Sequence, residues 1–285
     1  MSNPFYADLH AHTTASDGCL SPAALAARAM QAGITCLAIT DHDTTQGVEE
    51  AKKAAAGNGL SVLTGAELSA GPDGETHVLG YGTDPHNPHL TALFDKMYDE
   101  RIERAREMAQ KLRALGMEIP IEEIVQNARG SVGRPHIARA LVRAGYIQST
   151  EEAFERLIGA GMPAYVPRKR LDVTRAIQIL KRAGFVPVLA HPALMHVDEQ
   201  TFYALLNAWT EAGLMGLEAY HPSNEKERGY DFYVRAARGR GLLVTGGSDY
   251  HDDGGHHARL GETAMAWVSA KEDVDALKSA IEAAQ

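Results

Sequence analysis

The sequence has no run of about 18 apolar residues, the length that a membrane-spanning helix needs. Its opening stretch, MSNPFYADLH, lacks the basic and apolar segments of a secretory signal. Only two of the 285 residues are cysteine, Cys19 and Cys36, which excludes a framework of disulfides. We therefore expect a cytoplasmic globular protein with no membrane partner.

Several common catalytic and nucleotide-binding motifs are also absent. The sequence has no G-x-S-x-G motif for a serine nucleophile, no phosphate-binding P-loop and no G-x-G-x-x-G turn after a strand. Cys36 falls inside an apolar run, where a thiol usually packs and does not react. These absences exclude hydrolysis by a serine or cysteine nucleophile and nucleotide binding through either loop.

Positive charge is scarce overall, because 28 Lys and Arg stand against 37 Asp and Glu, for a net charge of −9. This balance argues against duplex DNA as a partner, since proteins that bind it usually present a basic face. The charge is uneven, however, because residues 96–182 hold 17 basic and 11 acidic residues. That local excess indicates either an anionic partner or solvated helix faces rich in arginine.

Short β-type runs alternate with helical segments along much of the chain, which is typical of an α/β protein built from parallel β/α units. In one such helix, Ser21 is a suitable N-cap and Pro22 suits the first helical position. Seven or eight runs favour a closed barrel over an open sheet. The runs are 5–10, 36–40, 61–68, 76–82, 185–191, 214–221, 242–249 and 264–270.

The alternation stops between about Leu93 and Tyr165, where no strand pattern occurs. Residues 93–116 have the periodicity of one long amphipathic helix, and residues 134–145 and 150–161 those of two more. We therefore predict an all-helical insertion over residues 96–165 that contributes to substrate binding. Residues 1–95 and 166–285 would form the discontinuous barrel domain.

Nitrogen and oxygen donors follow or lie within nearly every predicted strand. Residues at positions i and i+2 of a strand share a face, so His10 and His12 project together, as do Asp249 and His251. In a β/α barrel, functional groups gather at the carboxyl ends of the strands. The remaining donors are Asp17, His42, Glu67, His77 and His191. Each residue alone could be an ordinary polar residue, but a crowd of nine is costly to bury unless cations compensate. We therefore predict a metal centre.

The ordered segments DLHAHTTASDG, ITDHDT, GAELSA, HVLGYG, LAHP and GSDYH resemble the motifs of the PHP (polymerase and histidinol phosphatase) family. The resemblance covers the chain outside the insertion and implies a distorted (β/α)7 TIM-like barrel. With GRPHIARALV in the insertion, the sequence is most similar to the TrpH- or YciV-like branch. That branch contains 3′,5′-nucleoside bisphosphate phosphatases and 5′-to-3′ exoribonucleases that act on short RNA.

The resemblance implies three divalent metal ions held by the nine donors. His10, His12, Glu67 and Asp249 would hold the first ion, and Glu67 would bridge to a second held by His77 and His191. Asp17, His42 and His251 would hold the third, with Asp17 standing where many relatives have histidine. The nucleophile would be a metal-bridging hydroxide held through Glu67 and Asp249. Donors of this type favour Mn²⁺, with Zn²⁺, Fe²⁺ or Mg²⁺ as alternatives.

Further residues are candidates for roles around these ions. Asp41 and Asp43 could accept hydrogen bonds from ligand imidazoles, or could cap the following helix. Arg134 could grip a second phosphate of the substrate with its planar fork, or could point into solvent. The other candidates for substrate binding are Ser131, His136, His221 and His257.

The resemblance implies an enzyme that removes the 3′-phosphate of nucleoside bisphosphates, trims short 5′-phosphorylated RNA, or does both. Its partner would be a nucleotide or short RNA. Histidinol-phosphate hydrolysis is an alternative within the family, and amide hydrolysis is an alternative for such a metal centre. A catalytically silent metal-binding scaffold is the alternative from another class.

Overall fold

The computed structural model describes residues 5–71, 76–127, 132–167, 171–254 and 258–285. Its core is one sheet of seven strands in the order β1-β2-β3-β4-β5-β6-β7, so every strand pairs with its neighbour in the sequence. The strands are β1 (Ala7–Asp8), β2 (Cys36–Ile39), β3 (Ser61–Ala70), β4 (Thr76–Gly82), β5 (Val186–Leu189), β6 (Gly216–Tyr220) and β7 (Leu243–Gly246).

Hydrogen bonds between the first and last strands nearly close this sheet into a barrel. Leu9 N donates to Gly246 O at 2.9 Å, and His12 N donates to Tyr250 O at 2.9 Å. Ala11 and Tyr250 form a parallel bridge just beyond the ends of β1 and β7. The predicted α/β barrel of the distorted (β/α)7 type is therefore confirmed.

The expectation of uniformly parallel strands is wrong for β4, which is antiparallel to both β3 and β5. The reason is the short connection from Ala70 to Thr76, because a parallel neighbour needs a crossover of about a dozen residues or more. As a result, the first residues of β4 lie at the same barrel edge as the last residues of β3, and His77 pairs with Ser69.

The predicted strand at 264–270 is also wrong, because this segment forms turns that lead into α11 (Ala270–Ala283). Trp267 is only 2% exposed and packs in the same core cluster as Leu9, Val188 and Leu277. Part of the apolar character that suggested a strand therefore belongs to core packing by Trp267 and Ala270, whereas Met265 and Val268 are exposed.

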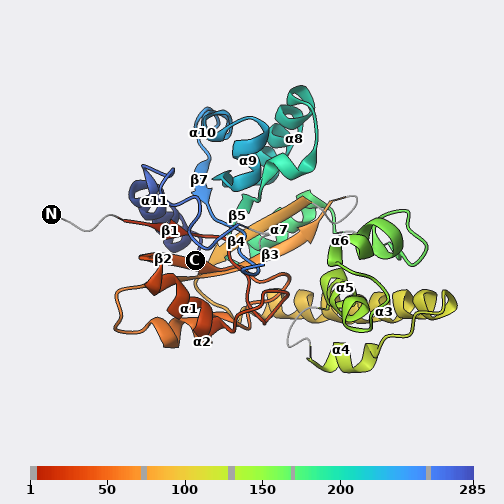
Figure 1. Ribbon diagram of the computed structural model, residues 1–285. Coiled ribbons are helices and arrows are strands. Elements are labelled where there is room, and N and C mark those ends of the chain that lie inside the picture. Colours follow the sequence, from red (N-terminus) through yellow and green to blue (C-terminus); the bar gives the residue numbers. More distant parts are fainter. Residues whose placement is uncertain (1–4, 72–75, 128–131, 168–170, 255–257) are drawn as a thin grey trace.

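Helices surround the sheet (Figure 1). Ser21 caps the first of them as predicted, since its side chain accepts a hydrogen bond from Ala24 N and Pro22 follows at the first helical position. On the barrel side the helices are α1 (Pro22–Gln31), α2 (Val48–Ala55), α7 (Val173–Arg182), α8 (Glu199–Ala212), α9 (Pro222–Glu227) and α10 (Tyr230–Arg238), with the short 3₁₀ helix η2 (Pro192–Met195).

A helical lobe lies between β4 and β5 and projects to one side of the barrel (Figure 1). It has its own buried apolar cluster, which includes Met108, Leu112, Ile137 and Leu141. Its elements are α3 (Pro88–Ala114), α4 (Ile121–Asn127), α5 (Arg134–Arg143), α6 (Thr150–Ala153) and the π-helical turn η1 (Phe154–Ile158). This confirms the all-helical insertion, while its division at residues 96 and 165 stays a prediction.

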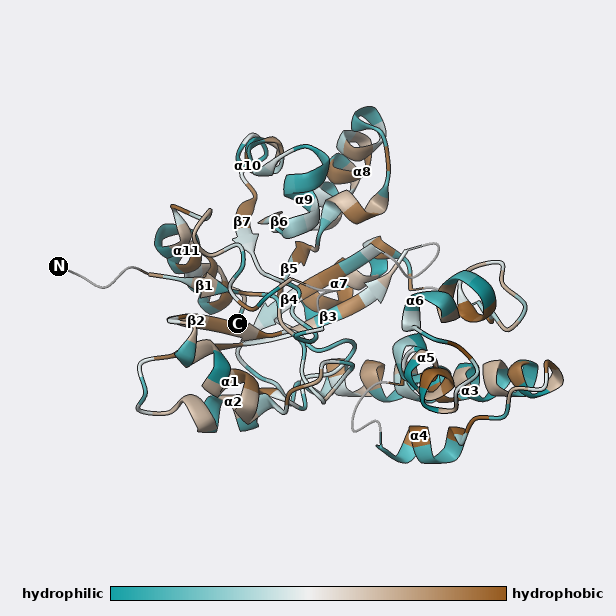
Figure 2. Cartoon of the chain, viewed as in Figure 1, coloured by the Kyte–Doolittle hydropathy of each residue, from teal (hydrophilic) through white to brown (hydrophobic). Residues whose placement is uncertain are grey.

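Hydropathy along the chain matches this arrangement, with apolar residues concentrated on the strands and on the inner faces of the helices (Figure 2). In the part of the chain that the structure describes, no helix combines the length and apolar character needed to cross a membrane.

Candidate metal centre

Nine side chains singled out in the sequence meet at one edge of the barrel. Most of them follow the carboxyl ends of strands, whereas Glu67 lies inside β3 and His77 lies near the start of the antiparallel β4. The nine are His10, His12, Asp17, His42, Glu67, His77, His191, Asp249 and His251, and none of them is more than 19% exposed at its side chain.

The first group of donors contains His10, His12, Glu67 and Asp249, whose ligand atoms all lie within 4.8 Å of one another. His12 Nε2 lies 3.0 Å from Asp249 Oδ1 and 3.4 Å from Glu67 Oε2. His10 Nε2 lies 3.3 Å from Glu67 Oε1 and 3.3 Å from Asp249 Oδ1. The four residues are those that the family resemblance implied for the first ion.

Glu67 also belongs to a second group of donors. Its Oε1 lies 2.8 Å from His77 Nδ1 and 3.1 Å from His191 Nε2, and these two nitrogens are 3.1 Å apart. Its Oε2 lies 2.9 Å from His42 Nδ1, and His42, Glu67 and His77 form a further group that could hold an ion. Glu67 therefore lies where a carboxylate could bridge two ions.

The third group contains His12, Asp17, His42 and His251. The Asp17 carboxylate lies 3.4 Å from His251 Nε2 and 3.9 Å from His42 Nε2. His12 Nδ1 lies 3.7 Å from Asp17 Oδ1, so His12 stands between the first and third groups. The resemblance implied the other three residues but not this shared histidine.

Several buried donor atoms in these groups make no hydrogen bond of normal geometry with the described residues, although carboxylates and imidazoles lie close to them. They are His10 Nε2, His12 Nε2, Asp17 Oδ1, His42 Nδ1, Glu67 Oε2 and Asp249 Oδ1. A buried polar atom without a partner is costly, and a coordinated cation would remove that cost. Imidazole nitrogen and carboxylate oxygen are ligands for divalent transition metals. The residues present therefore fit a cluster of divalent metal ions.

The electrostatics of the centre also favour cations. Burial raises the pKa of Glu67, but the imidazole of His77 and other histidines outweigh burial and hold this pKa well below its usual range. Burial lowers the pKa of His251, yet the carboxylates of Asp17 and Asp249 raise it to about 10. The carboxylates thus stay ionised and draw positive charge toward them, which is the state in which they bind metal.

Glu218 on β6 belongs to the centre and was missed in the sequence. It is fully buried, its Oε1 lies 3.0 Å from His10 Nδ1, and its Oε2 accepts a hydrogen bond from His191 N at 2.7 Å. When His10 Nδ1–H donates to this carboxylate, the lone pair of Nε2 is directed at the first donor group. A glutamate inside the otherwise apolar run LMGLEAYH was the available signal.

Asp41 does not cap the following helix, and its role toward the ligand imidazoles stays a prediction. It accepts hydrogen bonds from Thr13 N and Thr13 Oγ1, both at 2.7 Å, and from Ser16 Oγ at 2.6 Å. The N-cap of α2 is Gly47. Asp41 therefore holds the loop that carries Asp17.

Asp43 also contacts groups other than imidazoles. One carboxylate oxygen accepts a hydrogen bond from Ser69 N at 3.1 Å, and the other is paired with Arg101 of α3. Arg101 was not singled out in the sequence, where it is one of many arginines on an amphipathic helix.

Backbone strain is concentrated at this edge. Asp43, His191 and Asp249 have φ values of +52°, +24° and +55°, which cost a non-glycine residue roughly 1–3 kcal/mol. Gly247 provides room for His10, since a Cβ on this glycine would lie 2.3 Å from His10 Cβ. The surrounding structure therefore holds the donors in conformations that the chain does not prefer locally.

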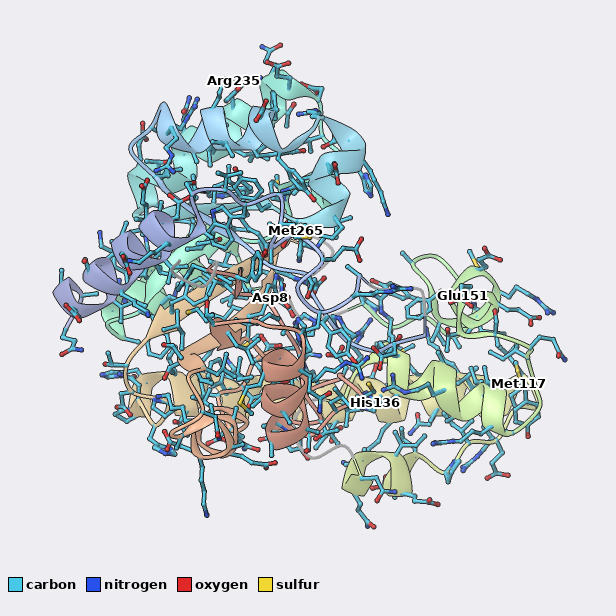
Figure 3. All side chains as sticks on the ribbon, turned by 60° about the vertical axis from the view of Figure 1, so that its left-hand side comes forward. Asp8, Met117, His136, Glu151, Arg235 and Met265 are labelled. Carbon is cyan, nitrogen blue, oxygen red and sulfur yellow. The ribbon has the colours of Figure 1, made fainter. Side chains whose placement is uncertain are left out.

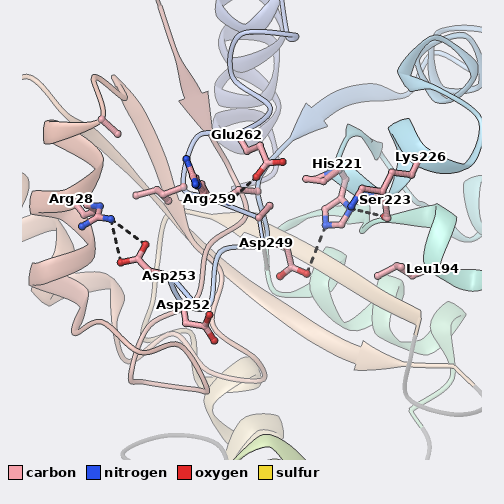
Figure 4. A pocket seen from close by; sticks show the side chains of 15 residues that line it. Arg28, Leu194, His221, Ser223, Lys226, Asp249, Asp252, Asp253, Arg259 and Glu262 are labelled. Carbon is pink, nitrogen blue, oxygen red and sulfur yellow. Dashed lines mark hydrogen bonds and ion pairs between the residues drawn. The ribbon is translucent and has the colours of Figure 1, made fainter. Parts of the chain in front are cut away.

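A cavity of about 940 Å³ opens beside the centre, with Asp249 and His221 in its wall (Figure 4). Arg28 from α1 and Lys226 from α9 also line it, so it lies between those two helices. It is large enough for a nucleotide, because ligand pockets commonly measure about 300–1,000 Å³.

His221 presents one ring nitrogen to this region. Ser223 N donates to His221 Nδ1 at 3.2 Å, so in the neutral imidazole the proton is on Nε2. His221 Nε2 is buried, lies 3.7 Å from Asp249 Oδ2 and has no hydrogen-bond partner in the described residues. An N–H at this position suits a substrate oxygen better than a metal ion.

The other predicted substrate-binding residues lie on the insertion. Arg134 begins α5, and its guanidinium lies 5.3 Å from the centre of the Phe154 ring. His136 lies on the side of the insertion that faces the barrel (Figure 3), and burial lowers its pKa to about 4, with the nearby charges of Arg139 and Asp17 acting in opposite directions. Ser131 and His257 lie outside the described residues.

A barrel whose strand ends gather nine histidine and carboxylate donors defines a metal-centred α/β barrel protein. The family model described as the PHP domain matches residues 8–160, and the chain belongs to this family. The family resemblance found in the sequence is thereby confirmed.

Named relatives share most of the length of the chain. It is 34% identical to a 5′-3′ exoribonuclease of Haemophilus influenzae, over 86% of this chain and 89% of that protein. It is 32% identical to a 3′,5′-nucleoside bisphosphate phosphatase of Chromobacterium violaceum, over 90% of each chain. Its fold is similar to the crystal structure of a proposed metal-dependent phosphoesterase of Bifidobacterium adolescentis, with a TM-score of 0.84, 32% identity and 96% of each chain covered.

Proposed function

We propose that the protein is a metal-dependent phosphoesterase that acts on nucleotides. It removes the 3′-phosphate of 3′,5′-nucleoside bisphosphates, trims short 5′-phosphorylated RNA from its 5′ end, or does both. The observation that carries this proposal is the cluster of buried donor atoms without partners around Glu67. The activities named for the two similar proteins support the substrate class.

Three divalent ions would be held by the nine donors, with Mn²⁺ favoured. The first set is His10, His12, Glu67 and Asp249, the second is Glu67, His77 and His191, and the third is Asp17, His42 and His251. Six imidazoles in one centre disfavour Mg²⁺, which prefers oxygen ligands. Three divalent ions against three carboxylates leave a surplus of positive charge, which suits a phosphate.

When bound, the ions would lower the pKa of a water molecule and neutralise charge that develops on the phosphoryl oxygens. The protein's own side chains orient the reactants. Glu218 fixes the ring of His10, and Asp41 holds the loop of Asp17. His221 lines the cavity, and its Nε2–H, 3.7 Å from Asp249 Oδ2, would donate a hydrogen bond to the leaving-group oxygen of the substrate.

The rest of the substrate would lie between the cavity and the insertion. Arg134 would bind a second phosphate, and Ser131, His136, His221 and His257 are the other residues that we propose for substrate binding. The cavity wall holds Arg28, Lys226 and Arg259 beside Asp252, Asp253 and Glu262, and Arg28 is paired with Asp253, so the attraction for an anionic ligand would come mainly from the bound ions. A single strand or a mononucleotide fits this arrangement, and we propose no duplex DNA partner.

A panel assay with Mn²⁺ tests the proposal. The substrates are adenosine 3′,5′-bisphosphate, a short 5′-phosphorylated RNA and histidinol phosphate, with the Asp249→Asn variant as the matched inactive control. We expect release of phosphate or mononucleotides from the first two, and less than a tenth of that rate from histidinol phosphate. A preference for histidinol phosphate would overturn the substrate class, and no turnover of any phosphate ester by metal-loaded protein would favour the scaffold.

A further inference from the structure

We propose that Arg101, contributed by the helical insertion, is a positioning residue that fixes the metal-binding segments of β2 and β3 in place. The proposal rests on the metal centre of the proposed function. It assigns the insertion a role in building the centre, beyond any role in binding substrate.

Arg101 lies at the contact between the two lobes. It belongs to α3, yet its guanidinium is paired with Asp43, and its Nη2 donates to Ser69 Oγ at 3.1 Å. The side chains of Arg101 and Asp43 are 10% and 2% exposed, so this ion pair is shielded from solvent. A shielded pair with a second hydrogen bond holds its members far more firmly than a surface pair does.

The two partners of Arg101 belong to the segments that supply metal ligands. Asp43 directly follows His42, and Ser69 is two residues beyond Glu67 on the same face of β3. Asp43 N donates to Glu67 O at 2.9 Å, and Ser69 N donates to Asp43 Oδ1 at 3.1 Å. Arg101 therefore closes a network that fixes the separation of His42 and Glu67.

This network also explains how Asp43 keeps its conformation. Its φ of +52° is unfavourable for an aspartate, and three hydrogen-bonding partners, Glu67 O, Ser69 N and Arg101, hold it there. Without Arg101, the buried carboxylate would lose the cation that α3 brings to it. The turn after β2 would then relax and move His42.

A direct role in gripping substrate phosphate fits Arg101 less well. Its Nη2 is occupied by Asp43 and Ser69, and its Nε is buried and has no partner among the described residues. Its Nη1 lies near Gly133, since a Cβ built on that glycine would be 3.9 Å from Nη1. Arg101 is not among the described residues that line the cavity, and its Nη2 contacts Asp43 and Ser69 instead.

The test compares Arg101→Gln and Arg101→Lys with Arg106→Gln on the same helix. Arg106 pairs with the exposed residues Glu103 and Glu122, which makes it a matched control. Backbone amide exchange is measured on metal-free protein, and Mn²⁺ affinity is measured by calorimetry. KM and kcat are measured with adenosine 3′,5′-bisphosphate.

We expect Arg101→Lys to fold, because it keeps the positive charge, and to lose the bridge between Asp43 and Ser69. Amide protection at Asp43 and Glu67 should fall about tenfold or more, and Mn²⁺ affinity by about 10–100-fold. The kcat should fall together with the Mn²⁺ affinity, and the KM at saturating metal should stay within about twofold of the value for the unmodified protein. Arg101→Gln should have larger effects in the same direction, and Arg106→Gln should match the unmodified protein.

Unchanged amide protection and Mn²⁺ affinity in both Arg101 variants would overturn the proposal. So would a large rise in KM with metal affinity intact, because that result would place Arg101 on the substrate. If the unmodified protein binds no Mn²⁺, the proposed function fails. The exchange measurement on metal-free protein still decides whether Arg101 fixes these segments.

Discussion

At the scale of single residues, the centre depends on charged groups that fix the ligands as well as on the ligands themselves. Glu218 fixes the tautomer of the His10 ring, since a carboxylate 3.0 Å from Nδ1 makes that nitrogen the hydrogen-bond donor. A histidine that rotates freely presents its lone pair to a metal ion only part of the time. The carboxylate therefore improves binding by ordering the ring before the ion arrives.

Glu218→Gln tests this role, because the amide keeps the shape of the side chain and loses its charge. We expect Mn²⁺ affinity and phosphatase activity to fall by about 10–100-fold, with little change in the melting temperature of the metal-free protein. Glu211→Gln, at an exposed position of α8, is the control. Equal metal affinity in the two variants, measured by calorimetry, would show that His10 needs no such partner.

Most of the nine donors could be predicted from the sequence because they follow or end a parallel strand, so the chain direction fixes the edge of the barrel that they reach. His77 lies near the start of β4 and reaches the same edge because that strand is antiparallel, which the expected parallel units did not include. Glu218 and Arg101 could not be found in this way. Their roles depend on which side chain faces which across the barrel, and the spacing along the chain does not contain that information. The three-ion assignment itself stays a proposal.

At the scale of secondary-structure elements, close approach of the chain at β7 determines where His10 lies. Gly247→Ala would place a Cβ 2.3 Å from His10 Cβ and 2.5 Å from His10 N. Both contacts are far inside normal van der Waals distance, and one of them is with backbone. We expect the variant to be destabilised by about 1–3 kcal/mol in urea unfolding and to hold less metal by elemental analysis. Native stability together with full metal content would show that the segment after β7 moves easily.

The insertion has a testable pH dependence through His136 on α5. Burial lowers the pKa of His136 to about 4 in the folded protein, below the value of about 6.5 that applies on unfolding. The unfolded chain therefore binds a proton first as the pH falls. Stability from this residue is complete above pH ~6.5 and is lost progressively toward pH ~4.

His136→Gln should therefore lose less stability than the unmodified protein when metal-free samples are taken from pH 7.5 to pH 4.5. We expect the difference in unfolding free energy to be roughly 1–3 kcal/mol, measured by urea denaturation. His89→Gln, at an exposed position of α3, should behave as the unmodified protein does. An equal fall in unfolding free energy toward low pH for all three proteins would show that His136 is protonated as easily in the folded protein as in the unfolded chain.

The predictions for elements succeeded where local pattern decides the structure and failed where pairing decides it. The cap of α1 and the helical character of α3 and α5 follow from nearby residues. The direction of β4 depends on its short connection to β3, which the expectation of uniform β/α units overlooked. Residues 264–270 have the composition of a strand, but they have no neighbouring strand to pair with once β7 and β1 meet.

At the scale of the whole molecule, the barrel concentrates ionised carboxylates and imidazoles at one edge and needs cations to be most stable. Ligand binding to the folded state stabilises it by RT ln(1 + [L]/Kd), or about 2.7 kcal/mol for one site at 100 times Kd. Removing metal with a chelator should therefore lower the melting temperature by roughly 5–10 °C. Glu67→Gln should show a much smaller shift, because Glu67 contacts donors of both the first and the second group. An equal fall in melting temperature on chelation for the unmodified protein and Glu67→Gln, measured by calorimetry, would show that Glu67 is not a shared ligand.

Anomalous diffraction from crystals grown with Mn²⁺ and inorganic phosphate tests the central claim most directly. The account predicts manganese peaks within the three donor groups, with Glu67 shared between two ions and a phosphate oxygen near Asp249 and His221. Crystals of active protein that show these nine side chains paired only with one another, and manganese bound elsewhere, would contradict it.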